Sequence, residues 1–252
     1  MTVRRGPERE DLVAVAAGSD VGCVRDVGRL FADEAFRVSV HGAFAVLARS
    51  VPCEAGISDL RRHEAVSSAL ALRIPMVPIP YACPLPAGPD MVSTLLLHEQ
   101  ELLAALEQVR GKAELGVTIA GTVRGPLPVA TYRRGTGRSY LESLLGPQRE
   151  ADAVIASARQ VLAQWGAQVV ERPLPTSNRF VFRASCLVYA ERIEQVERAL
   201  RAIPLRLAST GLPGHMALYV TGPWAPYTFT PHELLTGRGS PVAGDDLEKA
   251  NA

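Results

Sequence analysis

Histidines beside glutamates are the residues in this sequence that most resemble a reaction centre. His98-Glu99 lies in a stretch with helical periodicity, where a zinc peptidase would carry a second histidine four residues after the first. That position is Leu102, so the metal-binding pair is missing. We interpret the pair, together with Glu101, as part of a solvated helix face. The pair His63-Glu64 is interpreted as a surface or capping pair and not as an acid–base couple.

A basic, glycine-containing segment at residues 133–139 offers different chemistry. Arg133, Arg134 and Arg138 flank two glycines just before a predicted helix. Exposed backbone amides, a positive helix N-terminus and arginines could together hold an anion. The segment has neither the Walker spacing nor the Gly-x-Gly-x-x-Gly spacing of dinucleotide-binding proteins. Two interpretations therefore remain, an anionic-ligand site and a flexible basic linker.

No further reaction centre is visible in the sequence. Five histidines are scattered singly, a Gly-x-Ser-x-Gly elbow is missing, and Cys23, Cys53, Cys83 and Cys186 lie far apart. We expect no catalytic residues, no metal and no cofactor. Residues 1–11 lack the apolar core of a secretory signal, so we expect a cytoplasmic protein with reduced thiols.

Charge and hydropathy exclude several classes of partner. Twenty-seven basic and twenty-six acidic side chains leave a net charge of +1. This balance predicts neither a nucleic acid nor an anionic membrane as a partner. No apolar run approaches the roughly 20 residues that cross a bilayer. An apolar content of 47% is typical of a soluble globular protein.

The segment around residues 216–229 combines a strand pattern with stiff, aromatic residues. Residues 216–221 alternate as a strand, which should stop at Gly222 because two prolines follow. The residues that could act here are Gly222, Pro223, Trp224, Pro226, Tyr227 and Phe229. One interpretation is that the rings of Trp224, Tyr227 and Phe229 seal a core edge. The other is that they form an exposed surface on which a partner docks.

The remaining elements must position these residues. In the N-terminal half, the pattern predicts a strand at 12–17, a hairpin of 36–40 and 43–48, and a helix from Ser58 or Asp59 to Leu72. Three prolines make 74–80 an edge strand or an extended segment. One helix at about 91–110, ended by Gly111, precedes a strand at 112–120. This order indicates a ferredoxin-like α+β sandwich.

The C-terminal half is predicted to be a second α+β domain with a long helix and a small antiparallel sheet. Its long helix ends at Gly166, and strands follow at 168–171 and 180–189. A helix at 191–203, stopped by Pro204, precedes a strand at 205–207 that pairs with the final strand. We expect domains at 1–122 and 123–235 with a flexible tail at 236–252.

Four stretches of this sequence together resemble one protein family. They are His63-Glu64-Ala65-Val66 with Ile74-Pro75-Met76, Lys112-Ala113-Glu114-Leu115-Gly116-Val117, Arg138-Ser139-Tyr140-Leu141, and the run from Thr221 to Phe229. In this order they resemble the gas vesicle protein F/L family (GvpF/GvpL), over roughly residues 12–229. The family usually has an arginine, an aromatic residue and a glycine after the Pro-Met pair. This chain has Val77, Pro78 and Ile79 there, so any role of that arginine cannot be carried over.

The resemblance implies a non-enzymatic structural or assembly protein of gas vesicles. Its expected partners are the small, very apolar shell protein and other accessory proteins, and its expected location is the shell within the cytoplasm. Strand addition or a helix groove could hold an aggregation-prone shell segment. Apolar helix stripes also make self-association conceivable. The alternative is an α+β ligand-binding protein or enzyme that uses residues 133–139 for an anion.

Overall fold

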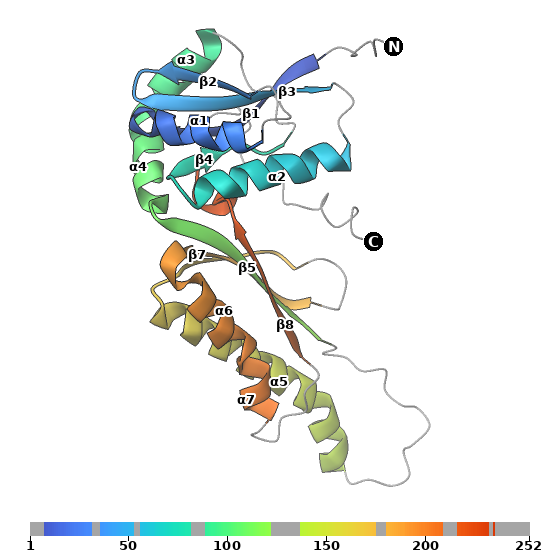
Figure 1. Ribbon diagram of the computed structural model, residues 1–252. Helices are drawn as coiled ribbons and strands as arrows, with labels where there is room; N and C mark the ends of the chain where they lie inside the picture. Colours follow the sequence, from blue (N-terminus) through green and yellow to red (C-terminus); the bar gives the residue numbers. More distant parts are fainter. Residues whose placement is uncertain are drawn as a thin grey trace. The chain divides into compact units, whose positions relative to one another are not determined.

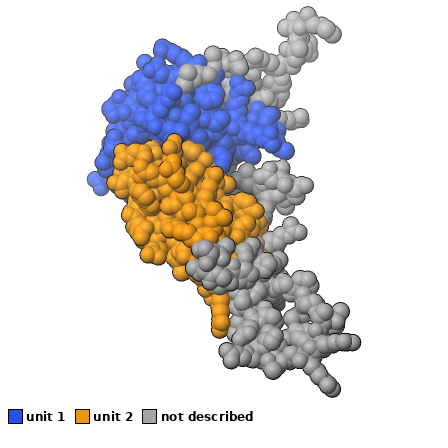
Figure 2. All heavy atoms as spheres, turned by 60° about the horizontal axis from the view of Figure 1, so that its bottom comes forward, with its two compact units in different colours: residues 1–113, 224–252 blue, residues 114–223 orange. Residues whose placement is uncertain are grey.

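The computed structural model describes residues 8–31, 36–52, 56–81, 89–121, 137–174, 180–208, 216–231 and 234. The chain divides into two compact units (Figure 2). Unit 1 contains residues 1–113 and 224–252, and unit 2 contains residues 114–223. Both are α+β, which confirms the predicted class. Residues 122–136, where the predicted boundary between the two domains falls, and the predicted tail at 236–252 lie outside the described residues.

This division differs from the expected boundaries near residues 122 and 235. Unit 2 begins inside the strand β5 (Lys112–Ala120), because this strand is a central member of the second sheet. The chain returns to unit 1 at Trp224, because Ala225 belongs to the hydrophobic core of that unit. Which residues fold independently stays a prediction.

Unit 1 is built on one four-stranded sheet (Figure 1). Its strands are β1 (Glu8–Ala17), β2 (Phe36–His41), β3 (Phe44–Pro52) and β4 (Met76–Pro78), in the order β2-β3-β1-β4. Each neighbouring pair is antiparallel, with Val38 opposite Leu47 and Val15 between Val46 and Val77. The hairpin and the edge position of the proline-rich strand are thereby confirmed. Gly42 makes the hairpin turn with a φ of 58°.

Helices cover both faces of this sheet, so its strands are apolar on both sides. One core holds Val24 and Val27 of α1 (Val21–Leu30) with Val66 and Leu70 of α2 (Ile57–Ala71). The other core holds Leu95 of α3 (Pro89–Leu97) with Leu102 and Leu106 of α4 (Glu99–Val109). A short 3-10 turn, η1 (Gly18–Asp20), connects β1 to α1.

Two predictions about these helices are corrected. The expected single helix at 91–110 is two helices, because the backbone of His98 leaves helical geometry at φ −111° and ψ 24°. The helix α2 begins at Ile57, after Gly56, and not after Ser58 or Asp59. The carboxylate of Asp59 instead accepts the backbone N–H of Gly56 at 3.0 Å, which satisfies a free donor at the helix start.

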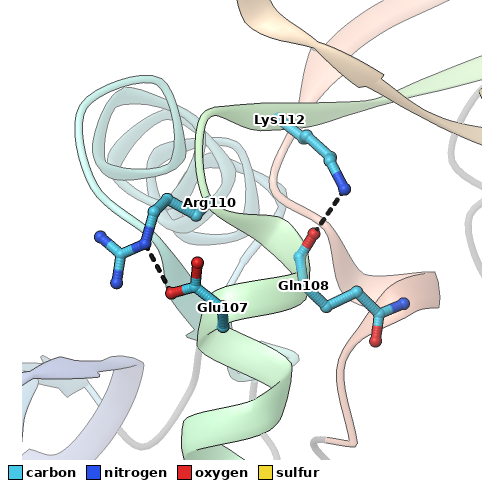
Figure 3. Close-up of polar contacts among 4 residues, drawn as sticks. All are labelled: Glu107, Gln108, Arg110 and Lys112. Atoms are coloured by element: carbon cyan, nitrogen blue, oxygen red, sulfur yellow. Dashed lines mark hydrogen bonds and ion pairs between the residues drawn. The ribbon is translucent and has the colours of Figure 1, made fainter. Parts of the chain in front are cut away.

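The end of α4 follows the prediction closely (Figure 3). Gly111 has a φ of 68°, a left-handed conformation that favours glycine after a helix. Lys112 Nζ donates to the carbonyl oxygen of Gln108 at 2.9 Å, as the negative end of the helix dipole favours. Arg110 Nε donates to Glu107 Oε2 at 2.7 Å, and this hydrogen bond raises the pKa of Arg110.

Unit 2 repeats the element order of unit 1. The elements are β5, α5 (Gly137–Gln164), β6 (Gln168–Glu171), β7 (Phe180–Tyr189), η2 (Ala190–Arg192), α6 (Ile193–Arg201), α7 (Ile203–Ala208) and β8 (Ala217–Trp224), and the sheet order is β6-β7-β5-β8. In each unit, therefore, the first strand lies between the third and the fourth. Leu115, Val117 and Ile119 of β5 are buried, as their alternation predicts.

Two predictions about unit 2 are wrong. Residues 205–207 do not form a strand but lie in the helix α7. Pro204 is the second residue of this helix, where a missing N–H costs little. The last strand does not stop at Thr221 either, because β8 continues through Gly222 and Pro223 to Trp224. The Gly222–Pro223 peptide is cis and Gly222 has a φ of 115°.

Candidate functional site

The segment after β8 is the predicted site for which the structure gives most detail. Ala225 is fully buried in the core of unit 1, and Tyr227 packs against the same core. A 3-10 turn, η3 (Tyr227–Phe229), follows, in which the N–H of Phe229 donates to the carbonyl of Pro226 at 3.1 Å. The hydroxyl of Thr230 donates to that carbonyl at 2.9 Å. Pro226 therefore receives two hydrogen bonds that hold the turn closed.

The three aromatic rings divide between the two interpretations. Phe229 is buried and Tyr227 is half-buried, as expected of rings that seal a core. Trp224 is 43% exposed, so part of an indole ring faces solvent. Gly222 and Pro223 are half-buried and Pro226 is buried. Of the predicted docking residues, Trp224 is the most accessible ring, and docking itself stays a prediction.

Two stretches of the family resemblance meet inside unit 2. A Cβ added to Gly116 of β5 would lie 2.6 Å from Oγ1 of Thr221 in β8. At so short a distance the neighbouring side chain must shift, so the glycine at residue 116 leaves space for Thr221 in its present position. This reason for a glycine could not be predicted, since the sequence does not say which residue of β8 faces Gly116.

A buried acidic group lies on the same strand. The side chain of Glu114 is 8% exposed and lies 3.6 Å from Arg172 Nη2. Arg172 Nε also donates to Ser185 Oγ at 2.8 Å. Burial, with a smaller contribution from the charge of Glu114, raises the pKa of Cys186 from its ordinary value of 9.0 to about 12. Cys186 is therefore a buried, protonated thiol of the core.

The first stretch of the resemblance lies in the interior of unit 1. His63 is fully buried, and its Nε2 hydrogen-bonds the carbonyl oxygen of Ile79 at 2.7 Å. The interpretation of His63-Glu64 as a surface pair is therefore wrong for His63. Its ring lies edge-on to Tyr81, with 5.5 Å between centroids. The imidazole thus connects α2 to the segment just after β4 and does structural work there.

A buried arginine lies next to this histidine, and no local pattern in the sequence predicts it. Arg49 of β3 is 1% exposed, and its Nη2 donates to the carbonyl oxygen of Asp59 at 2.9 Å. Its guanidinium lies 5.6 Å from the ring centre of Tyr81. A cation–π contact and a carbonyl partner partly offset the cost of burying the charge. Arg49 thereby connects β3 to the first turn of α2.

A hollow of about 350 Å³ opens in unit 2 between α5 and the β6–β7 hairpin. Arg159 and Glu171 form an ion pair across it at 2.6 Å, and the guanidinium of Arg159 lies over the ring of Phe182. Its lining mixes acids, arginines and apolar side chains, namely Asp152, Ile155, Arg159, Glu171, Arg172, Leu174, Val181, Phe182 and Arg183. Nucleophile and general base do not come together in it.

The predicted anion site cannot be built from the described part of the chain. Arg133 and Arg134 lie outside the described residues, and so does the side chain of Arg138. The helix α5 begins at Gly137, so the last three residues of this segment belong to the helix and do not precede it. Within the ranges that the structure describes, no three histidine, cysteine or acidic side chains could hold a metal ion. None of the helices in those ranges has the length and hydrophobicity to cross a membrane.

Comparison with known proteins identifies the family. The family model of gas vesicle synthesis protein GvpL/GvpF matches residues 15–128 and 132–231. The chain belongs to this family. All four stretches of the resemblance lie within the matched residues, and the contacts of His63, Gly116 and Ala225 show that part of each of three stretches serves packing. No curated protein sequence matches the chain.

Two solved structures of GvpF have the same fold. Gas vesicle protein GvpF from Anabaena sp. aligns with a TM-score of 0.65 at 16% identity, over 88% of this chain and 96% of that chain. GvpF from Microcystis aeruginosa aligns with a TM-score of 0.62 at 14% identity, over 87% and 98%. At these identities the likeness shows the fold alone, so the GvpL/GvpF fold includes both units.

Proposed function

We propose that this GvpL/GvpF chain is a non-enzymatic accessory protein of gas vesicle assembly that binds the small hydrophobic shell protein and other assembly proteins. The observation that carries the proposal is the family match, which extends over both units from residue 15 to residue 231. Its site of action in this proposal is the gas vesicle shell within the cytoplasm.

The chemistry of the described residues supports a binding role. The buried polar groups Arg49, His63 and Glu114 hold strands and helices together. In the hollow between α5 and the β6–β7 hairpin, Arg159 is paired with Glu171. The exposed indole of Trp224 gives an apolar contact at the sheet edge formed by β8. Aromatic side chains of this kind are enriched where proteins bind each other.

We also propose that each unit is a ferredoxin-like sandwich. The support is the strand–helix–strand–strand–helix–strand order in both units, with the first strand between the third and the fourth. In unit 1 the helices α3 and α4 add a further layer to this sandwich. The edge strands of the two sheets, β2 and β4 in unit 1 and β6 and β8 in unit 2, could accept a strand of an apolar partner.

The alternative of an anionic ligand at residues 133–139 stays a prediction that no described contact favours. Thermal unfolding tests it directly: a nucleotide or phosphate should raise the melting temperature, and Arg133→Ala with Arg138→Ala should abolish the rise. An unchanged melting temperature would count against this alternative.

The proposed function is tested by co-purification from gas-vesicle-forming cells. The tagged chain should retain the shell protein, and a Trp224→Ser variant should retain less of it, because the exposed ring is lost. Arg25→Ser, on the exposed surface of α1, is the matched control. Deletion of the gene should reduce cell buoyancy. Buoyant cells without the gene, with no shell protein on the tagged chain, would contradict the proposal.

A further inference from the structure

Two helix faces of this chain expose leucines, and their charges are opposite. The first, the acidic leucine face, consists of Leu96, Glu99, Leu103 and Glu107 on α3 and α4 (Figure 1). These residues follow one another at steps of three and four, so they lie along one side of the helix pair. The two leucines are 55% and 40% exposed.

The departure from helical geometry at His98 does not interrupt the acidic leucine face. The N–H of His98 bonds the carbonyl of Thr94 at 3.2 Å, and the N–H of Leu102 bonds the carbonyl of His98 at 3.0 Å. The helical phase therefore continues from α3 into α4. Leu95, Leu102 and Leu106 occupy an adjacent side of the helices and are buried in the core. Leu96 and Leu103 thus have no role in that core.

The charge of the acidic leucine face is one-sided. Residues 89–109 contain Asp90, Glu99, Glu101 and Glu107 but no lysine or arginine. Glu107 is paired with Arg110 (Figure 3). Within the described part of the chain, Glu99 forms no ion pair. A partner for this face must therefore combine apolar side chains with positive charge.

The second face, the basic leucine face, has this combination. It consists of Arg198, Arg201 and Leu205 on α6 and α7, again at steps of three and four. The N–H of Arg206 bonds the carbonyl of Ala202 at 3.1 Å, so the helical phase continues across the junction. The apolar side of these helices is buried through Val196, Leu200 and Ile203.

The exposure and charge of the basic leucine face complement those of the acidic one. Leu205 is 77% exposed. Residues 198–208 contain three arginines and no acid, while Glu194 lies one turn before Arg198 on the same side of α6. Arg201 Nη2 forms an ion pair with Glu197 Oε2 at 3.3 Å, whereas Arg198 forms no ion pair among the residues that the structure describes.

We propose that the acidic leucine face of one copy of this chain binds the basic leucine face of a second copy. The contact joins two different surfaces, so it is heterologous, and it generates a ring or an open filament. Burial of the three leucines drives it, and the opposite charges set the register. Such a small surface predicts a weak, concentration-dependent association. The inference does not depend on the proposed function.

Sedimentation of the full chain over a range of concentrations tests this contact. We expect the average mass to rise with concentration at low salt and to fall when salt is added, because salt screens the charges. Two variants reverse one face each: Glu99→Lys with Glu107→Lys, and Arg198→Glu with Arg201→Glu. Each variant alone should associate at least about tenfold more weakly than the parent, since like charges then face each other.

An equimolar mixture of the two variants is the decisive measurement. In the mixture, the lysine-substituted face of the first variant can bind the glutamate-substituted face of the second variant. The unchanged acidic face of the second variant can bind the unchanged basic face of the first, so association should return. The matched control is Arg25→Glu with Arg61→Glu on exposed positions of α1 and α2, which should associate like the parent. Circular dichroism and the melting temperature verify that each variant is folded.

Three results would overturn the inference. The parent chain could stay monomeric at all concentrations in low salt. Either reversed variant could associate as strongly as the parent. The mixture could also fail to associate although both variants are folded.

Discussion

The contact of Gly116 with Thr221 makes a sharp prediction for a single residue. Exchanging a strand glycine for alanine ordinarily stabilises a protein slightly, because the unfolded chain loses freedom. Here the new Cβ would lie 2.6 Å from Thr221 Oγ1. A β-branched threonine can move away only with difficulty, so Gly116→Ala should lower the free energy of unfolding by about 1–3 kcal/mol.

The chain offers a direct way to measure this loss. It contains two tryptophans, Trp165 in unit 2 and Trp224 in unit 1. In a Trp224→Phe background, Trp165 fluorescence during urea unfolding reports on unit 2. Adding Thr221→Ala should restore most of the stability lost through Gly116→Ala. Independent effects of the two substitutions would show that the residues do not compete for the same space.

The buried thiol of Cys186 predicts a dependence of stability on alkaline pH. Its pKa is raised from 9.0 to about 12 in the folded chain. In the unfolded chain this thiol loses its proton above pH 9, whereas in the folded chain it keeps it. Its contribution to stability is therefore full below pH 9 and is lost as the pH rises towards 12.

The difference between the parent and Cys186→Ala isolates this effect from other titrating groups. The stability of the parent should fall more steeply than that of the variant between pH 9 and 11. In addition, a chain whose only cysteine is Cys186 should not react with Ellman's reagent at pH 8 until it unfolds. Rapid labelling of the folded chain would show that the thiol is accessible and that its pKa is not raised by burial.

Residue environments were harder to predict than residue chemistry. The sequence alone showed that no second histidine follows His98 at the spacing of a zinc site, because such a motif is a local pattern. The burial of His63 and Arg49 was not, since it depends on Ile79 and Asp59, whose positions only the folded chain defines. Charged residues are usually exposed, and that general rule fails wherever a specific partner is available.

Among the secondary structure elements, the start of β8 depends on the helix α5. Glu150 of α5 is 3% exposed, and its Oε1 accepts the backbone N–H of Met216 at 3.2 Å. Glu150→Ala removes this acceptor and leaves a buried donor, which should cost about 1–3 kcal/mol of stability. Glu150→Gln keeps an acceptor oxygen and should cost less. The Trp165 fluorescence assay distinguishes the two, and equal losses would mean that the charge and not the hydrogen bond matters.

Elements with strong periodicity were predicted correctly, and elements at turns were not. The strand at 112–120 alternates, the apolar positions of α5 recur every three or four residues, and their burial follows these patterns. The strand at 180–189 was also predicted, although residues 184–188 are buried on both of its faces. Residues 205–207 read as a strand because Leu-Arg-Leu alternates. In the structure the half-buried Leu207 follows Ile203 at a helical step, and Pro204 lies in the first turn of a helix instead of ending one. Three residues are too few to separate the two periods.

On the scale of the whole molecule, unit 1 is assembled from two distant parts of the chain. Its core includes Ala225 and Tyr227 together with residues 13–76. A chain truncated after Pro223 should therefore lose protection of unit 1 while β6 and β7 of unit 2 stay protected. Hydrogen exchange measured by mass spectrometry resolves the two units. Truncation after residue 234, which keeps the core residues, is the matched control.

Equal protection of unit 1 in both truncated chains would show that Ala225 and Tyr227 add little to its core. The sequence alone predicted two α+β halves and the role of the C-terminal segment as a possible seal. It did not predict that the segment belongs to the first half, because the pattern of a strand does not reveal which core receives the residues after it.

Because unit 1 consists of two separate stretches of the chain, its folding during synthesis on the ribosome is affected. The residues that complete its core follow an insertion that spans residues 114–223. At typical elongation rates of about 5–20 residues per second, the nascent unit waits roughly 5–20 seconds for them. Unit 2 is continuous and emerges complete within that interval. The usual order, in which the N-terminal part closes first, is therefore reversed by the path of this chain.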